Sequence, residues 1–269
     1  MNYLSSLKYL YYPGCTIKRD ALEYEEKSLL LLRKMGIELK ELESWYCCGA
    51  LPSLAIDDIM SYVGGTRTLI EAQKLIRRGD FNGLLTLCPM CYNVLKRINL
   101  VLENDPDKLE ILTEYMEEEE RYGLGVNVVH IVEVLAGNID RLKEIATEKL
   151  TEFKVAVYYG CTLLRPKEIA IDDPENPEII ENLLTSLEVA IVDYPFKTEC
   201  CGSYHILTNR NIVVDRVKRI VSSALRRGAN IITVVCPLCM YNLKQVVKEG
   251  NKLRAMYLSE LLVHLVGDR

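Results

Sequence analysis

The chain has 269 residues, with 33 Lys and Arg against 38 Asp and Glu, which gives a formal net charge of −5. Hydrophobic residues make up 49% and charged residues 26%, so the composition is that of a globular protein and excludes a disordered or fibrous chain. Because no Lys/Arg-rich run occurs, nucleic acid is not an expected partner. The apolar windows are shorter than a spanning helix and no signal-peptide core begins the sequence, so we expect no membrane insertion and a cytoplasmic location.

Short β-rich runs alternate with helical segments along the chain. Strands are predicted at residues 7–12, 84–87, 155–159 and 231–235, and helices at residues 21–35, 66–78 and 212–226. Gly36, Gly79 and Gly228 follow these helices and close them. Strands followed by helices predict an α/β fold, with mostly parallel sheets flanked by helices.

The ten cysteines form two sets of five with the same pattern. Each set has a lone cysteine, then an adjacent pair followed by glycine, then a C-x-x-C pair. The first set is Cys15, Cys47, Cys48, Cys88 and Cys91, and the second is Cys161, Cys200, Cys201, Cys236 and Cys239. Flanking residues repeat as well, since Arg-Arg-Gly precedes each C-x-x-C pair. An internal duplication is the simplest explanation.

The duplication divides the chain into two pseudo-symmetric domains. A new apolar strand begins at residue 155, just beyond a polar stretch, so we place the domains at residues 1–150 and 151–269. The first copy has an additional segment before its last helix, and this segment contains the acidic run 117–120. Such a run is typical of a solvated helix face or a hinge.

In each half, the lone cysteine follows one predicted strand and the C-x-x-C pair follows another. Loops beyond the carboxyl ends of parallel strands form the usual ligand crevice of an open α/β sheet. Pro89 and Pro237 suit the first turn of the helices that come next. Amides at such helix ends offset part of the charge of thiolates. We therefore expect each set of cysteines to form a ligand site at the end of a sheet.

Three chemistries use clustered cysteines. Disulfides fit poorly, because neighbouring cysteines rarely pair without strain. Structural zinc takes four ligands, so the lone cysteine would be surplus in both copies, although zinc at one site stays an alternative. Soft thiolates at loop tips favour iron–sulfur clusters. Since an ordinary cubane cluster takes four cysteines, a set of five indicates an unusual cluster or a cluster beside a reactive thiol.

Two copies of Cys, Cys-Cys-Gly and Cys-x-x-Cys resemble the CCG domain family. Four short sequence segments are similar to the B-type subunit of heterodisulfide reductase and its relatives: residues 45–50 (WYCCGA), 160–166 (GCTLLRP), 172–177 (DDPENP) and 192–195 (VDYP). The resemblance covers essentially the whole chain. It implies two α/β domains that face each other, each holding one non-cubane [4Fe-4S] cluster through the five cysteines of its set.

The resemblance also implies a function and partners. In the family, this B-type subunit cleaves a disulfide reductively between the two clusters. Electrons arrive from a small ferredoxin-like subunit, which is fed by another subunit that carries flavin and iron–sulfur clusters. A small disulfide or another sulfur compound is then the expected substrate, and the expected activity is that of an oxidoreductase working within a complex. Two one-electron centres suit a disulfide, which takes two electrons.

Two other functions stay open. CCG-containing subunits of glycolate, lactate or glycerol-3-phosphate oxidising complexes transfer electrons without catalysing the reaction. Those relatives often carry ferredoxin-type cysteine runs, which this sequence lacks. A zinc-stabilised scaffold for complex assembly is the other alternative, and it would have no use for a fifth thiol in each copy.

Three residues that follow cysteines are candidates for catalysis. His205 is placed to donate a proton or to hydrogen-bond to a cluster sulfur. Arg165 and Lys167 are placed to balance cluster charge or to hold an anionic substrate. An ordinary exposed loop explains all three as well. His130 and His264 lie in apolar stretches and are interpreted as packing or surface residues.

Overall fold

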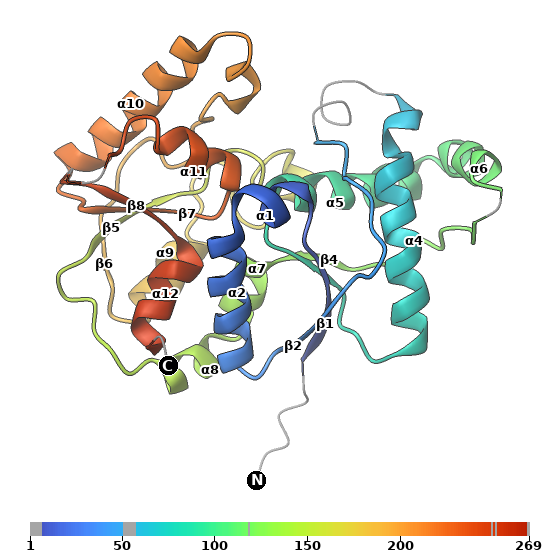
Figure 1. The fold of residues 1–269 in the computed structure, drawn as a ribbon, viewed down its shortest axis with the longest axis horizontal. Coiled ribbons are helices and arrows are strands. Elements are labelled where there is room, and N and C mark those ends of the chain that lie inside the picture. The colour runs from blue at the N-terminus through green and yellow to red at the C-terminus, as the bar shows by residue number, and fades with distance from the viewer. Residues whose placement is uncertain (1–6, 51–57, 118, 249, 251, 268–269) are drawn as a thin grey trace. The chain divides into compact units, whose positions relative to one another are not determined.

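The computed structural model describes residues 7–50, 58–117, 119–248, 250 and 252–267. Within this part the chain forms two four-stranded parallel sheets flanked by helices (Figure 1). The strand order is β2-β1-β3-β4 in one sheet and β6-β5-β7-β8 in the other, so the second half repeats the first strand for strand. The predicted α/β fold with duplicated parallel sheets is confirmed.

The first half contains one sheet and the helices that connect its strands. Its strands are β1 (Lys8–Tyr12), β2 (Glu38–Glu41), β3 (Leu84–Thr86) and β4 (Val128–His130). Its helices are α1 (Cys15–Asp20), α2 (Leu22–Lys34), the one-turn 3₁₀ helix η1 (Ile59–Tyr62), α4 (Val63–Arg78), α5 (Pro89–Asn104), α6 (Pro106–Tyr115), α7 (Ile131–Gly137) and α8 (Ile139–Ile145).

The second half has the same order of strands and shorter connections. Its strands are β5 (Lys154–Tyr158), β6 (Ala190–Ile191), β7 (Ile231–Val234) and β8 (Arg254–Tyr257). Its helices are the 3₁₀ helix η2 (Lys167–Ile169), α9 (Ile179–Thr185), the 3₁₀ helix η3 (Ser203–His205), α10 (Arg210–Arg226), α11 (Pro237–Leu243) and α12 (Leu258–Val266). Helices α10 and α11 cover one face of this sheet, and α9 and α12 cover the other (Figure 1).

The four predicted strands are the central pairs β1 and β3, and β5 and β7. Their residues are apolar and mostly buried, as expected for parallel strands covered on both faces. The outer strands carry weaker signals. Strand β2 reads Glu-Leu-Lys-Glu and lies exposed at the sheet edge, where Glu38 pairs with Lys8 at 2.9 Å. Charged residues of this kind protect an edge strand from pairing with another chain.

Two compact units can be distinguished, and they differ from the two sequence halves. One unit comprises residues 1–19 and 32–131, and the other comprises residues 20–31 and 132–269. Most of α2 therefore belongs to the second unit, in which the rings of Tyr24 and Tyr257 stack with centroids 4.2 Å apart. The domain boundary at residue 150 stays a prediction.

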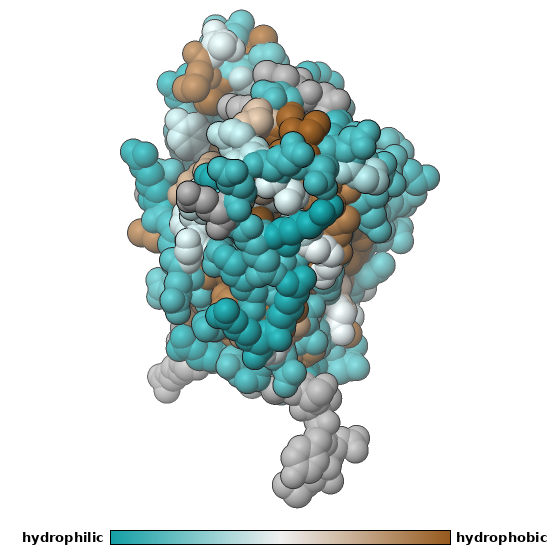
Figure 2. Space-filling view, turned by 90° about the vertical axis from the view of Figure 1, so that its right-hand side faces the viewer, coloured by the Kyte–Doolittle hydropathy of each residue, from teal (hydrophilic) through white to brown (hydrophobic). Residues whose placement is uncertain are grey.

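Glu117, Glu119 and Glu120 of the acidic run follow α6 and lie outside the helices, so they are not a helix face. Glu119 pairs with Arg67 of α4 at 2.5 Å, and Glu120 pairs with Arg77 further along the same helix. Glu118 lies outside the described residues. Figure 2 shows the side on which α4 and α6 lie, and hydrophilic side chains cover much of it.

No described helix has the length and apolar character needed to cross a membrane.

His130 ends β4 as a fully buried side chain, in agreement with its interpretation as a packing residue, while His264 is exposed. The Nε2 atom of His130 donates to the carbonyl of Leu87 at 3.0 Å, next to the C-x-x-C pair. Burial lowers the pKa of His130 to about 3, because a charged imidazolium would lose its hydration.

We predict that His130 makes the folded state sensitive to acid. Its folded pKa lies below its unfolded value, so its contribution to stability is present above about pH 6.5 and is lost as the pH falls toward 3. Between pH 7 and pH 4.5 this one group should remove about 3 kcal/mol of unfolding free energy. Urea unfolding of the wild type, His130→Gln and the exposed control His264→Gln measures this. An equal loss in all three proteins would contradict it.

Candidate iron–sulfur site

The first set of cysteines lies beyond the carboxyl ends of three adjacent parallel strands. Cys15 begins α1 after β1, Cys47 and Cys48 follow β2, and Cys88 and Cys91 follow β3 at the start of α5. Because β2, β1 and β3 are neighbours, their carboxyl ends meet at one end of the sheet. The Sγ atoms of Cys15 and Cys47 lie 3.8 Å apart, and those of Cys48 and Cys91 lie 3.6 Å apart.

The second set occupies the equivalent positions in the second sheet. Cys161 follows β5, Cys200 and Cys201 follow β6, and Cys236 and Cys239 follow β7 at the start of α11. The Sγ atoms of Cys201 and Cys239 lie 3.5 Å apart. The arrangement therefore repeats the contact between the second cysteine of the adjacent pair and the second cysteine of C-x-x-C.

Hydrogen bonds to sulfur fix the adjacent pair of the second set. The backbone N–H of Gly202 donates to Sγ of Cys200 at 3.3 Å, and the side-chain amide of Asn242 donates to Sγ of Cys201 at 3.3 Å. Donors aimed at sulfur stabilise a thiolate. Asn242 is buried on α11, so its position depends on the helix that also carries Cys239.

A buried tyrosine at the end of each central strand holds the adjacent pair in place. The hydroxyl of Tyr12 donates to the carbonyl of Tyr46 at 2.8 Å, and the hydroxyl of Tyr158 donates to the carbonyl of Glu199 at 2.7 Å. Each acceptor is the residue directly before the adjacent cysteines. Sequence reasoning did not single out these tyrosines, although the repeated Tyr-Tyr before the lone cysteine is a visible signal.

The glycine before each lone cysteine allows sulfur to approach the backbone. Gly14 has φ +72°, and a Cβ atom there would lie 2.9 Å from Sγ of Cys91. Gly160 has φ +70°, and its Cβ atom would lie 3.2 Å from Sγ of Cys239. The glycine after each adjacent pair also has a positive φ, of +74° and +81°, as expected for a turn that lets both thiols face one site.

Crowding of thiols controls their acidity. Contacts with the thiols of Cys47 and Cys91 lower the pKa of Cys48 to about 5, while the contact with Cys48 raises the pKa of Cys91 well above its ordinary value. Hydrogen bonds from neighbouring thiols, that of Cys161 first, lower the pKa of Cys200 to about 2 and raise that of Cys161. Neighbouring thiols therefore share protons, and full ionisation of a set needs added positive charge.

The donor atoms fit a soft metal centre. Each set supplies five thiols and no carboxylate, and soft thiolates select iron–sulfur clusters or zinc. Among the described residues, no three or more His, Cys, Asp or Glu side chains are arranged to hold a single metal ion. The five-cysteine ligand sets stay a prediction, and the close approach of sulfur to the two glycines is the structural feature that suits them.

An arginine contacts the adjacent pair or its flanking residue in both halves. Arg67 of α4 lies over the ring of Tyr46 at 5.5 Å. Its equivalent on α10, Arg216, donates from Nη1 to the carbonyl of Cys200 at 3.4 Å. Because the two arginines occupy the same position before Arg-Arg-Gly, this contact is part of the duplicated architecture. Neither arginine was predicted as a site residue.

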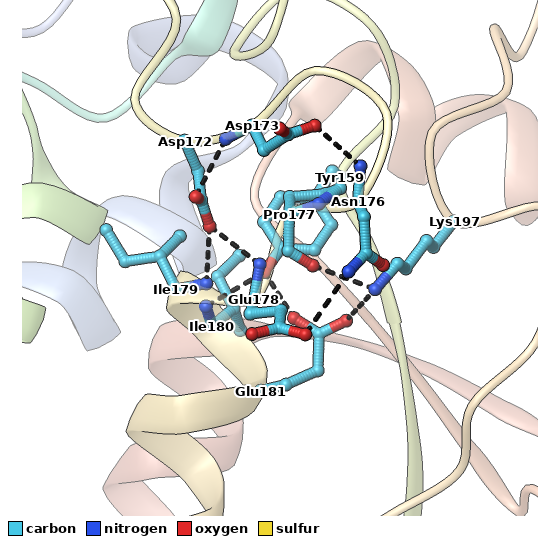
Figure 3. A network of polar contacts seen from close by, with 10 residues as sticks. All are labelled: Tyr159, Asp172, Asp173, Asn176, Pro177, Glu178, Ile179, Ile180, Glu181 and Lys197. Atoms are coloured by element: carbon cyan, nitrogen blue, oxygen red, sulfur yellow. Dashed lines mark hydrogen bonds and ion pairs between the residues drawn. The ribbon is translucent and has the colours of Figure 1, made fainter.

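A polar network orders the loop that follows the second lone cysteine (Figure 3). The Asp172 carboxylate accepts from the N–H groups of Glu178 and Ile179 at 2.6 and 2.7 Å, so it caps α9 from outside the helix. Tyr159 accepts from the N–H of Ile180 at 2.9 Å and donates to Glu181. Because Tyr159 directly follows β5, the network ties this loop to the strand that positions Cys161.

The three predicted catalytic residues are exposed and follow cysteines of the second set in the chain, in a loop or a one-turn 3₁₀ helix. The guanidinium of Arg165 pairs with Glu175 at 2.9 Å within the same loop. The backbone N–H of Arg165 donates to the carbonyl of Cys161 at 3.1 Å. Lys167 begins η2, and His205 ends η3 with an exposed side chain. Their roles in binding or proton transfer stay predictions.

We predict that Gly14→Ala disturbs the first set specifically. Gly14 and Gly36 have nearly equal φ values of +72° and +70°, so alanine at either position costs about 1 kcal/mol of stability through backbone strain. Only at Gly14 does the new methyl group meet Sγ of Cys91, whereas nothing lies within 4 Å at Gly36. In the iron-free protein, the buried thiol of Cys91 should therefore react with an aromatic disulfide reagent faster in Gly14→Ala than in Gly36→Ala. Equal rates would contradict the close approach.

We also predict that Asp172 stabilises the loop after Cys161. Asp172→Ala leaves two N–H groups at the start of α9 without their acceptor, which should cost about 1–2 kcal/mol. Asp172→Asn keeps an acceptor oxygen and should restore much of the loss. Urea unfolding gives the free energies, and limited proteolysis tests whether cleavage within residues 162–177 increases. Wild-type stability in the alanine variant would show that the cap is not needed.

Comparisons with known proteins agree with the repeated cysteine pattern. The CCG family, described as a cysteine-rich domain, matches residues 9–96 and 155–244. The chain is 26% identical to the 8-methylmenaquinol:fumarate reductase membrane anchor subunit of Wolinella succinogenes, over 95% of this chain and 90% of that protein. It is also 26% identical to the B-type subunit of the ferredoxin/F420H2-dependent CoB-CoM heterodisulfide reductase of Methanosarcina acetivorans, over 84% of this chain and 76% of that protein.

Two further matches extend over nearly the whole chain. A protein of Archaeoglobus profundus that is named as similar to the B-type subunit of heterodisulfide reductase is 25% identical over 97% of this chain and 88% of its own length. A solved structure of a hypothetical protein from Helicobacter pylori gives a TM-score of 0.70 at 11% identity, which shows a likeness of fold alone. It covers 97% of this chain, which spans about half of that protein's length. With both matched regions placed on the two repeated sheets, the chain belongs to the CCG cysteine-rich domain family.

Proposed function

We propose that the chain is the iron–sulfur subunit of a multi-subunit oxidoreductase that reduces a disulfide or a related sulfur compound. The observation that carries the proposal is the pair of equivalent five-thiol sets, each gathered at the carboxyl end of a parallel sheet. Relatives named as the B-type subunit of heterodisulfide reductase support a sulfur substrate. The same names support a multi-subunit complex. In this proposal the complex is cytoplasmic and contains one ferredoxin-like partner and one partner that carries flavin and iron–sulfur clusters.

Each set would hold one [4Fe-4S] cluster of a non-cubane kind, with all ten cysteines as ligands. When bound, such clusters supply electrons one at a time, at a potential that hydrogen bonds to sulfur adjust. A disulfide consumes two electrons and two protons and yields two thiols, so two sites of equal construction suit one sulfur–sulfur bond. Zinc, with four ligands, would leave one thiol of each set without a role.

The surrounding residues would orient the cysteines, bind the substrate and neutralise its charge. Tyr12 and Tyr158 hold the adjacent pairs through the carbonyl groups before them. Exposed His205 would supply a proton to a departing thiolate, because an imidazole can act as a proton donor. Arg165 and Lys167 would hold an anionic part of the substrate in the loop after Cys161, where Arg165 must then exchange its pairing with Glu175.

One finding favours a second function, in which the chain only transfers electrons. The match to the fumarate reductase anchor subunit extends over 95% of this chain and 90% of that protein. A chain of this kind would pass electrons between partner proteins without contacting a sulfur substrate. The two functions differ in whether the loaded complex consumes a disulfide.

We expect replacement of one cysteine to affect one site only. The chain isolated without oxygen should contain about 8 iron atoms, and Cys48→Ser or Cys201→Ser should lower this to about 4, because each set binds its cluster independently. Both variants should lose disulfide reduction, measured as oxidation of a reduced viologen by the chain with its partner subunits. Circular dichroism should show that the unaltered half keeps its structure.

The pair of variants serves as its own matched control, since the two positions are equivalent in the duplication. Unchanged iron content in either one would contradict the five-cysteine site. Full iron content with no turnover of the CoM–CoB disulfide, glutathione disulfide or a persulfide would favour electron transfer alone. Reduction of fumarate by the same complex would establish the second function.

A further inference from the structure

The two cysteine sets share several of the contacts around their sulfur atoms. In each half the second thiol of the adjacent pair lies against the second thiol of C-x-x-C, at 3.6 Å in the first set and 3.5 Å in the second. In each half the N–H of the glycine after the pair reaches the first thiol of that pair, from Gly49 to Cys47 and from Gly202 to Cys200. These repeated contacts make the two sites alike.

The amide of Asn242 has an apolar counterpart in the first half. Helices α5 and α11 both begin at the proline that follows the first cysteine of C-x-x-C, so their residues can be matched position by position. Asn242 is the sixth residue of α11, and the sixth residue of α5 is the buried Val94, whose side chain has no donor. Asn93 lies one position earlier, so its side chain leaves α5 about 100° away from that position. The second set thus has an amide at a helix position where the first set has a valine.

Asn242 is buried with one polar atom against sulfur and the other without a partner. The residue is 1% exposed, and its Nδ2 atom donates to Sγ of Cys201 at 3.3 Å. Within the part of the chain that the structure describes, its Oδ1 atom has no hydrogen-bond partner. A buried amide oxygen of this kind costs stability, whereas the valine at the matched position packs without that cost. The effect of the amide on sulfur therefore explains this residue better than packing does.

Neighbouring elements fix the direction of this amide. Helix α11 packs against α10, η3 and β8, and Cys239 on the same helix contacts the same sulfur. A thiolate sulfur has no proton to donate, so only the Nδ2 side of the amide can face a metal-bound Cys201. The amide then presents a fixed dipole with its positive end toward sulfur.

Arg216 also lies beside the adjacent pair, but solvent weakens its effect on sulfur. Its Nη1 atom donates to the carbonyl of Cys200 and lies 4.0 Å from Glu199. Its side chain is 44% exposed, so water and the carboxylate of Glu199 screen its charge. A buried donor in direct contact with sulfur is not screened in this way. We therefore assign the main difference between the two sites to Asn242.

An electron that enters an iron–sulfur cluster adds one negative charge, which the ligand sulfurs share. A hydrogen bond donated to a ligand sulfur stabilises the reduced form more than the oxidised form, so it raises the reduction potential. Resting on the proposed function, we propose that Asn242 is a positioning residue that acts through Cys201 to raise the reduction potential of the second five-cysteine site. One electron from a one-electron reductant is taken up at that site, and no bond forms or breaks. Two sites with equal sets of thiols thereby become unequal.

The test compares Asn242→Val with Gln245→Leu as its matched control. Gln245 is a second side-chain amide, three residues further on, and its Nε2 atom donates to the carbonyl of Tyr241 at 3.1 Å and not to sulfur. The iron-loaded full chain is titrated with dithionite and redox mediators without oxygen, and electron paramagnetic resonance follows its reduction. We expect Asn242→Val to lower the reduced-to-oxidised ratio of one centre on the order of tenfold at a given potential, which is a shift of about 59 mV. Gln245→Leu should leave both centres unchanged.

Two further measurements identify the centre and the cause. In a Cys48→Ser background, which should retain only the second cluster, Asn242→Val should produce the same shift. Asn242→Ala should shift the potential in the same direction, and it serves as the second variant if valine disturbs iron uptake. Urea unfolding of the iron-free chain should show Asn242→Val to be at least as stable as the wild type, because the substitution removes an amide oxygen that has no partner.

An unshifted potential in both Asn242 variants at full iron content would overturn the role of Asn242. So would an equal shift in Gln245→Leu, a shift of the first centre only, or loss of iron from the second site in both Asn242 variants. Lower stability of iron-free Asn242→Val with an unchanged potential would show that the amide is structural. A chain whose potential shifts as expected but which consumes no disulfide would refute the proposed disulfide reduction and keep the role of Asn242. A chain that holds zinc alone would overturn both.

Discussion

Five thiols that lie close together cannot all ionise unless positive charge is added. Three pairs of sulfur atoms lie 3.5 to 3.8 Å apart, two in the first half and one in the second, and neighbouring cysteines raise and lower one another's pKa by sharing protons. Parallel strands force this crowding, because the carboxyl ends of three adjacent strands meet at one place. Three repeated features help to hold the thiols together: the tyrosine hydroxyl that binds the carbonyl before the adjacent pair, the glycine that sulfur approaches closely, and the arginine of α4 or α10.

Duplication explains both the likeness and the difference between the halves. Both halves share the strand order and the tyrosine hydroxyl that binds the carbonyl before the adjacent pair. They also share the glycine before the lone cysteine and the arginine near the adjacent pair. The first half adds α6 and an acidic segment, and the carboxylates of that segment neutralise α4. Without that addition, α10 stays basic. The two sites are thus built alike but are surrounded by different charge.

The sequence predicted the features that repeat in one dimension. Central strands such as β1 and β5 are continuous apolar runs, and the cysteine pattern identified both sets. The edge strands β2 and β6 were not predicted, because β2 is charged and β6 has only two residues. The roles of Tyr12, Asp172 and Arg216 were not predicted either. Each acts on a backbone group that only the fold brings close, so no local residue pattern reports the contact.

The central claim is that each set of five cysteines holds an iron–sulfur cluster. Anomalous X-ray diffraction from crystals grown without oxygen, recorded at the iron and the zinc absorption edges, tests this directly. The account predicts strong iron density at both sheet ends, bordered by the five Sγ atoms of one set in each case, and no zinc signal. Zinc density at both positions, or iron bordered by only one of the two sets, would contradict it.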